Sequence, residues 1–225
     1  MARRGFILIL YVFIVYSCIP LDLTDDPNSE YYVNPNELYP IPDSYKQVDS
    51  ISNIYVEYDP FDDDYTYNHK YLLTTGVLSP LKIHFEQKVY GLIIKINFTY
   101  RGDDWIFFNS ATIINESGGR VGFGFEEEYK FHDVNYYGVT EKATFFQDDD
   151  DHGEKIISGH VFKDQVDEMR KLLSKEEVIK MKLSGTGSMV YEFSNECRLA
   201  LLETINYYYK LAGFNDTKYT NVNEN

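Results

Sequence analysis

Apolar side chains alternate with polar or small ones through much of the middle of the chain. The clearest case runs from Val89 to Tyr100, where one register is apolar or aromatic throughout: Tyr90, Leu92, Ile94, Ile96, Phe98 and Tyr100. Trp105 to Ile114 is a second β-rich run, with apolar residues on both faces, and Val121 to Phe131 is a third. A period of two residues is typical of half-buried strands. Because turn residues separate the three runs, we expect an antiparallel meander.

Further short strands are expected around the meander, at residues 54–58, 136–146, 156–161, 179–183 and 189–193. The period changes in two places to that of a helix. One helical face carries Phe162, Val166, Met169 and Leu173, and a second carries Cys197, Leu201, Ile205, Tyr208 and Ala212. Ser194 is placed to cap the second helix and Gly213 to end it. The predicted fold class is α+β, with an antiparallel β-sheet meander flanked by two helices, including a C-terminal helix.

We expect one β-rich globular domain over residues 54–213, preceded by a linker and followed by a frayed polar tail at 214–225. The linker, residues 18–53, contains five of the seven prolines. The N-terminal part of the chain is also acidic, since twelve Asp or Glu residues lie between Asp22 and Tyr67 against the single Lys46. Such a composition favours an extended, hydrated segment.

The first residues have the pattern of an export signal. Arg3 and Arg4 precede eleven unbroken apolar or aromatic residues, Phe6 to Tyr16. That run is about half of the roughly 20 residues that a helix needs to cross a bilayer. A basic start followed by a short apolar core is typical of a secretory signal peptide, here residues 1–17.

Cleavage after Ser17 would leave Cys18 as the new N-terminus. The sequence Val15-Tyr16-Ser17-Cys18 resembles the lipobox of bacterial lipoproteins, in which this thiol is acylated, although Tyr16 replaces the usual small residue. We therefore predict lipid attachment at Cys18 and a membrane-anchored place in the cell envelope, periplasmic or surface-exposed. Two alternatives stay open: an ordinary secreted protein with a plain Cys18 thiol, and a terminal segment buried in the domain.

Charge and cysteine content limit the partners and the chemistry. The net charge of −15 makes nucleic acid an unlikely ligand class, because binding to phosphate backbones requires clustered Lys and Arg. The expected partners are the membrane, through the N-terminal lipid, and a protein or glycan ligand. With Cys18 acylated, Cys197 has no intramolecular partner, so no disulfide framework is expected. Cys197 itself is expected to be a buried small hydrophobe.

Three sequence motifs resemble an uncharacterised family of small bacterial lipoproteins. These proteins carry a Gly-Asp-Asp-Trp-apolar-Phe strand, a Leu-Ser-Gly hairpin and a closing Tyr-rich helix. The corresponding residues here are Gly102 to Phe107, Leu183-Ser184-Gly185 and Tyr207-Tyr208-Tyr209. The resemblance covers roughly Leu92 to Leu211 and implies a lipidated β-rich domain without a known activity.

Motifs of common enzymes are absent, and the five histidines, at 69, 84, 132, 152 and 160, show no ligand spacing. Asp103-Asp104 beside Trp105 suits sugar binding, although a turn followed by a core tryptophan explains the same residues. The acidic loop Asp148 to Glu154 matches an EF-hand loop only in part, because its twelfth position is Gly159 instead of Glu. We therefore predict no catalytic residue, no cofactor and no metal ligand.

The sequence favours a non-catalytic module that binds protein or glycan. Its 21 tyrosines include clusters at 31–32, 136–137 and 207–209, and tyrosine is both a good interface residue and a good strand former. The alternative is a carboxylate-dependent hydrolase acting on envelope or host polymers, for which two carboxylates would have to face each other across a cleft.

Overall fold

The computed structural model describes residues 41, 43–74, 79–135, 138–148, 155–157, 160–162 and 164–213. All of them belong to one compact unit, Tyr39–Asn225. The predicted signal peptide, Cys18, most of the linker, the tail after Gly213 and the first two tyrosine clusters lie outside the described residues.

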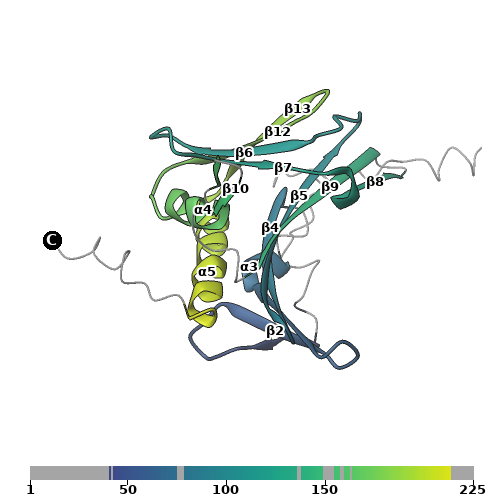
Figure 1. Ribbon diagram of the computed structural model, residues 1–225. Helices are drawn as coiled ribbons and strands as arrows, with labels where there is room; N and C mark the ends of the chain where they lie inside the picture. Colours follow the sequence, from purple (N-terminus) through teal and green to yellow (C-terminus); the bar gives the residue numbers. More distant parts are fainter. Residues whose placement is uncertain are drawn as a thin grey trace, which may run out of the picture. The chain divides into compact units, whose positions relative to one another are not determined.

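Seven antiparallel strands form the larger sheet, in the order β1-β2-β3-β4-β5-β9-β8 (Figure 1). Its strands are β1 (Lys46–Gln47), β2 (Ile54–Asp59), β3 (Asp64–His69), β4 (Leu81–Lys88), β5 (Gly91–Gly102), β9 (Gly138–Asp148) and β8 (Lys130–Asn135). The first five follow one another in the order of the chain, so this part of the sheet is a meander. Every described pairing in it is antiparallel.

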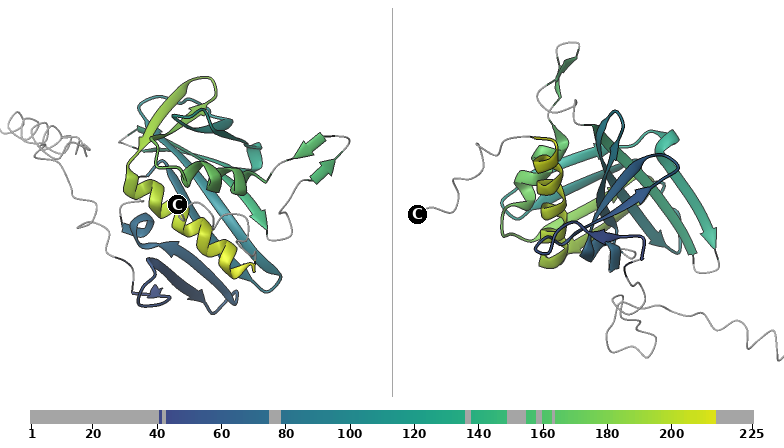
Figure 2. Two further views of the ribbon diagram at one scale, coloured as in Figure 1. Left: turned by 90° about the vertical axis from the view of Figure 1, so that its left-hand side faces the viewer. Right: turned by 90° about the horizontal axis from the view of Figure 1, so that it is seen from below.

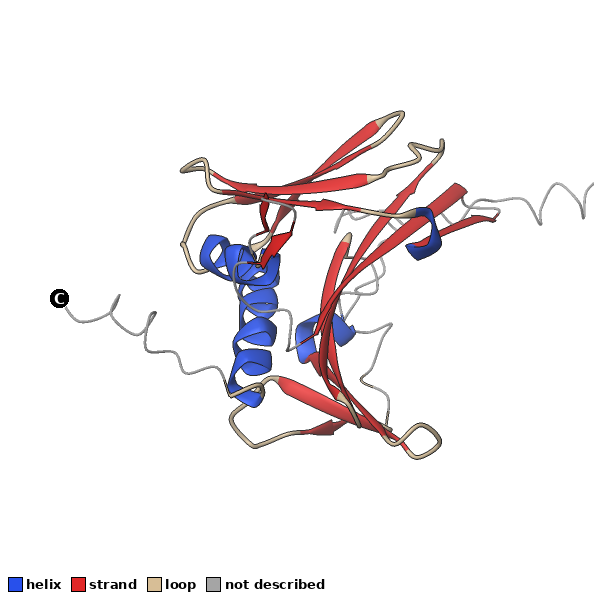
Figure 3. Cartoon of the chain, in the orientation of Figure 1, coloured by secondary structure: helices blue, strands red, loops and turns tan. Residues whose placement is uncertain are grey.

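A second antiparallel sheet has four strands in the order β13-β12-β6-β7. They are β13 (Ser188–Phe193), β12 (Ile179–Ser184), β6 (Ser110–Asn115) and β7 (Arg120–Gly124). Figure 3 shows this sheet lying across one end of the larger one. The strands β10 (Lys155–Ile157) and β11 (His160–Phe162) pair only with each other, in a hairpin that stands away from both sheets in Figure 2.

The described helices are α3 (Lys70–Thr74), α4 (Gln165–Leu173) and α5 (Asn195–Leu211), together with the 3-10 turn η1 (Glu127–Tyr129). The side chain of Ser194 accepts a hydrogen bond from the backbone N–H of Cys197, which confirms the predicted cap of α5. Gly213, at φ +74°, follows the helix end as expected. Within the described part of the chain, no helix combines the length and the apolar character that crossing a membrane requires.

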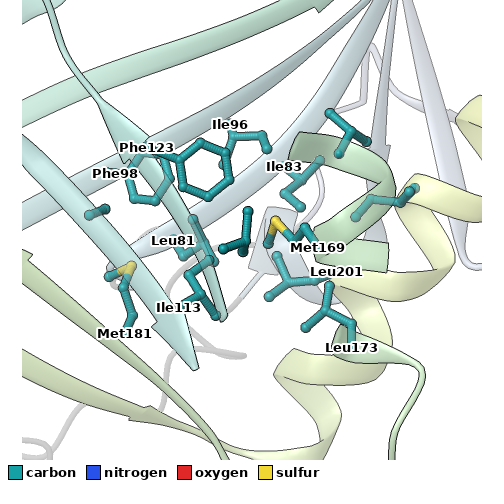
Figure 4. Close-up of a cluster of buried hydrophobic side chains, with 14 of the residues drawn as sticks. Leu81, Ile83, Ile96, Phe98, Ile113, Phe123, Met169, Leu173, Met181 and Leu201 are labelled. Atoms are coloured by element: carbon teal, nitrogen blue, oxygen red, sulfur yellow. The ribbon is translucent and has the colours of Figure 1, made fainter. Parts of the chain in front are cut away.

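The core lies between the two sheets and the helices α4 and α5 (Figure 4). Strand β5 contributes the predicted alternating register, with Leu92, Ile94, Ile96, Phe98 and Tyr100 all buried. The rings of Phe98 in β5 and Phe123 in β7 lie 5.1 Å apart and join the two sheets. Val166, Met169 and Leu173 of the first predicted helical face, in α4, and the predicted stripe of α5 close the core from the side. Phe162, predicted to share the first face, lies in the strand β11 instead. The α+β class, with antiparallel sheet flanked by helices, is thus confirmed.

The predicted meander of three consecutive runs is wrong in its pairing. The first run, β5, lies in the larger sheet. The second and third runs instead contain β6 and β7, which pair as a hairpin in the smaller sheet. The second run enters β6 only at Ser110, and the third ends its strand at Gly124 before η1 turns the chain back into the larger sheet as β8. The expected strand at 156–161 is instead the hairpin β10–β11.

Candidate functional site

The segment between β5 and β6 is folded around a buried carboxylate. Glu141, in β9, is only 1% exposed. Its Oε1 accepts the backbone N–H groups of Ile106 and Phe107 at 2.7 and 2.9 Å, and its Oε2 accepts that of Phe108 at 2.9 Å. Three consecutive amides therefore converge on one side chain. We call this arrangement the Glu141 clasp, and it is why the apolar residues from 105 to 108 form no strand.

The clasp also explains an unusual backbone conformation. Phe107 has a φ of +45°, which non-glycine residues rarely adopt. Such strain persists only where the surrounding structure enforces it, and it clusters at binding sites. Here the enforcing contacts are the three hydrogen bonds to Glu141, since consecutive amides point the same way only when the chain curls around their acceptor.

The turn of the β12–β13 hairpin closes over the same segment. A Cβ atom at Gly185 would lie 2.1 Å from the carbonyl oxygen of Phe107, so only glycine fits there. The N–H of Gly187 and the hydroxyl of Thr186 both donate to the carbonyl oxygen of Ile106, at 3.1 and 3.0 Å. The Gly-Asp-Asp-Trp-Ile-Phe and Leu-Ser-Gly motifs, which begin 81 residues apart in the sequence, are therefore in direct contact.

Three aromatic side chains gather on this segment and the neighbouring strand β8, and we call them the aromatic platform: Trp105, Phe107 and His132. The rings of Trp105 and Phe107 are stacked, with centroids 5.7 Å apart and planes 22° apart. His132 meets Trp105 edge-on at 5.6 Å and Phe107 at 6.0 Å. Trp105 is half-buried, whereas Phe107 is 51% exposed and His132 is also exposed. Trp105 packs against the core, as the core-tryptophan interpretation predicts, while part of its surface stays open.

The acid pair that suits sugar binding, Asp103-Asp104, lies at the start of the same segment. Asp103 and Asp104 are exposed and precede Trp105. The hydroxyl of Tyr100 donates to the backbone carbonyl of Asp104 at 2.8 Å and anchors the bend. The turn interpretation of these two residues accounts for the observed backbone.

A second candidate is the pair of the buried His69 and the exposed Glu203, which lines a pocket of about 460 Å³. His69 Nε2 lies 2.9 Å from a Glu203 carboxylate oxygen, and His69 Nδ1 accepts the backbone N–H of Tyr71 at 3.0 Å. Because Nδ1 accepts a hydrogen bond from this amide, its lone pair is not available to take a proton from a nucleophile. Burial lowers the pKa of His69, against the opposing effect of the Glu203 carboxylate. This pair is structural.

A further pocket, of about 400 Å³, is lined by Glu176, Glu177 and Arg198 among others. Glu177 accepts the backbone N–H of Ser117 at 2.9 Å, which lowers the pKa of its carboxyl group. The pKa is also lowered in the other described carboxyl groups that have a shift, those of Glu86, Glu127 and Glu196. A general acid for glycoside cleavage needs a shift in the opposite direction.

Other residues that the sequence singled out contribute to the core and not to a binding surface. Cys197 is buried in the core, and burial raises the pKa of its thiol to about 11. Of the closing tyrosines, Tyr208 and Tyr209 are buried and offer no docking surface. Among the described residues no cluster of three potential metal ligands occurs. The acidic loop after Asp148, residues 149–154, lies outside the described part of the chain.

Sequence reasoning missed Glu141, although a signal was present. Val139, Glu141 and Ala143 share one register of β9, and all three are buried. A charged residue in an otherwise apolar register has to be matched by hydrogen-bond donors. No family model, curated protein or solved structure matches the chain.

Proposed function

We propose that this chain is an exported, lipid-anchored binding protein of the cell envelope that holds a protein or glycan ligand on the aromatic platform. One observation carries the proposal: the exposed ring of Phe107, stacked on Trp105, stands on a backbone that a buried carboxylate holds in place. Aromatic side chains supply large contact areas with few rotatable bonds and dominate many binding surfaces. A loop that is ordered before binding loses less entropy when the ligand arrives.

The anchoring part of the proposal is supported by the sequence alone. The short apolar run ends at Cys18, and the resemblance to small lipoproteins points the same way. One acyl chain binds membranes only marginally, whereas two or more give durable anchoring. Intact-mass measurement of the mature protein should therefore show acyl groups on Cys18, and Cys18→Ala should move the protein into the soluble fraction. Cys197→Ala removes the other thiol and should leave the protein on the membrane. A mature mass without acyl addition would refute the anchor.

The binding part is testable because Trp105 is the only tryptophan of the chain. Its emission can be followed while the protein is titrated with a panel of envelope oligosaccharides and with purified envelope proteins. A ligand of the platform should change the emission, and Phe107→Ala should weaken its binding about tenfold or more. Phe61→Ala is the matched control, because Phe61 is 95% exposed in the β2–β3 turn, whereas His132 of the platform lies on β8 at the other edge of the sheet.

The titration distinguishes a glycan ligand from a protein ligand, because only the oligosaccharides or only the envelope proteins should give saturable binding. Equal affinity of wild type and Phe107→Ala for every probe that binds would place the binding site elsewhere. The hydrolase alternative has no comparable support, because the shifted carboxyl groups of the described residues have lowered pKa values.

A further inference from the structure

Strand β8 forms one edge of the larger sheet, and in the strand order of the described residues no strand lies beyond it (Figure 1). It is six residues long, Lys130–Asn135. An edge strand turns the backbone N–H and C=O groups of every second residue away from its neighbour, where another strand can bond to them. The opposite edge of this sheet is β1, which has only two residues. The edge with room for a further strand is therefore β8.

The strand register shows which backbone groups of β8 point outward. The N–H of Thr99 in β5 donates to the carbonyl oxygen of Pro80 at 2.8 Å, on the side of β4. Directions alternate along a strand, so Tyr100 turns its backbone groups toward β9, where it is opposite Glu141. The same alternation across β9 and β8 turns outward the backbone groups of Lys130, His132 and Val134.

Two of these outward N–H groups are available to a further strand. The N–H of Lys130 already donates to the carbonyl oxygen of Glu127 at the end of η1. Among the described residues, no backbone or side-chain acceptor bonds to the N–H of His132 or Val134. The free edge therefore offers two donors, together with the carbonyl groups of the same residues.

Apolar side chains flank this edge on both faces of the sheet. On the face away from the core, Phe131 is 54% exposed, and Tyr129 packs edge-on against Phe146 at 4.8 Å. On the other face Val134 is 68% exposed, and His132 belongs to the aromatic platform. A strand docked beside β8 would cover both sets of side chains while its backbone bonds to the free groups. Exposed apolar residues on an edge strand favour pairing with another chain.

The charge around β8 favours a basic occupant. Residues 126–135 contain four acidic side chains against one lysine. Lys130 is paired with Glu127 at 2.7 Å. No ion pair of the described residues involves the exposed side chains of Glu126, Glu128 and Asp133. Cationic side chains on a docked strand would therefore be attracted to this edge.

Two other occupants fit this edge less well. A second copy of the chain would bring another net charge of −15 against the first. The N-terminal linker, residues 18–53, contains five prolines, which lack the N–H that a sheet ladder requires. Its acidic residues also outnumber its single lysine. Both comparisons favour a segment of another protein.

We propose that β8 binds an extended, basic segment of a partner protein, which adds to the larger sheet as an antiparallel strand beside the aromatic platform. In this mode of recognition main-chain hydrogen bonds supply affinity and alternate side chains supply specificity. An antiparallel strand places its C-terminal end at the start of β8, next to Glu126 and Glu128, so lysine or arginine is expected at that end. The inference rests on the proposed function, and it narrows the ligand from protein or glycan to a polypeptide.

The probe is a short synthetic peptide of alternating valine and threonine residues that ends in two lysines. Calorimetry and the emission of Trp105 measure its binding. Two further versions carry backbone N-methyl groups, one on the valines and one on the threonines, so each lacks the N–H groups of one edge. An added strand bonds through one edge only, so one methylated version should bind like the parent peptide and the other roughly tenfold more weakly. Replacing the two lysines by glutamates should also weaken binding.

Val134→Pro removes an outward N–H of β8 and should bind the peptide roughly tenfold more weakly. Proline is tolerated on an edge strand where the N–H faces away from the sheet, so the variant should fold. Val190→Pro is the matched control, because Val190 is 57% exposed on β13, the edge strand of the smaller sheet. The bond from the N–H of Asn115 to the carbonyl of Gly119 fixes, by the same alternation, that its N–H also points outward. This control should bind like wild type.

The outcomes separate this inference from the proposed function. If Phe107→Ala weakens peptide binding while Val134→Pro and both methylated peptides leave it unchanged, the platform binds the peptide without strand addition, and the inference is wrong. Binding of oligosaccharides but of no peptide also overturns the inference and leaves the proposed function standing. Absence of binding by every probe overturns both. Dimerisation in sedimentation equilibrium that Val134→Pro abolishes and Val190→Pro preserves would identify a second copy as the occupant, against the proposal.

Discussion

Replacing Glu141 by glutamine tests the clasp on which the aromatic platform depends. The glutamine oxygen can occupy the place of Oε1 and keep the bonds from Ile106 and Phe107, but its NH₂ group then faces the N–H of Phe108. Hydrogen bonds to a charged acceptor contribute about 1.5–3 kcal/mol, and a buried donor without a partner costs about 1–3 kcal/mol. Since the side chain is only 1% exposed, we expect Glu141→Gln to lower the free energy of unfolding by about 2–4 kcal/mol.

Truncation should be worse than neutralisation. Glu141→Ala leaves all three amides without an acceptor, two of them buried, and opens a cavity among Val139, Ala143 and their neighbours. The expected loss is about 4–6 kcal/mol, at the upper end for a single substitution.

Urea unfolding measures both losses, provided that the dependence of the free energy on urea is unchanged between variants. Emission from Trp105, the only tryptophan, reports on the clasped segment at the same time. Glu192→Gln is the control, because Glu192 is exposed and its ion pair with Lys180, at 3.3 Å, should contribute less than about 1 kcal/mol. If Glu141→Gln unfolds at the same urea concentration as this control, with unchanged emission, the three hydrogen bonds do not hold the segment.

Three further predictions concern stability. Phe123→Ala should lower the free energy of unfolding by about 3–5 kcal/mol in urea, because the ring is 2% exposed between the sheets, and an unchanged midpoint would show that its packing contributes little. Gly185→Ala should destabilise the protein by more than about 2 kcal/mol through its clash with the carbonyl of Phe107, whereas Gly124→Ala, whose Cβ has no neighbour within 4 Å, should change the midpoint far less; equal effects would contradict this. Burial lowers the pKa of His69 below its unfolded value of about 6.5, so its contribution is complete above that pH and is lost as the pH falls towards the folded pKa. Between about pH 7.5 and 5, wild type should therefore lose more stability than His69→Gln, and equal losses would contradict the assignment.

Most of the individual helices and strands can be predicted from the local sequence. The alternation from Leu92 to Tyr100 is the buried register of β5, and the stripe that begins at Cys197 is the buried face of α5. Ser194 and Gly213 mark the two ends of that helix as expected. These features were readable because periodicity and capping depend on residues a few positions apart, so the local sequence contains the whole signal.

The pairing of the strands, in contrast, cannot be predicted from local sequence. Alternation identifies a strand but not its neighbours, because pairing partners are distant in the chain and any strand with the right register is a candidate. Strand β5 pairs with β4 and β9 and not with the run that follows it. Strand β9 pairs with β5 although β6, β7 and β8 lie between these two strands in the chain. No residue close to β9 in the sequence predicts that pairing.

The segment after β5 shows the same limit at the level of single residues. Trp105, Ile106, Phe107 and Phe108 have the composition of a strand, and local preference favours one. The segment instead curls around Glu141, which follows 33 to 35 residues later in the chain. A buried carboxylate is stable only where several donors converge on it, and convergence is a property of the assembled sheets. The positive φ of Phe107, the need for glycine at 185 and the exposed platform all follow from that distant contact.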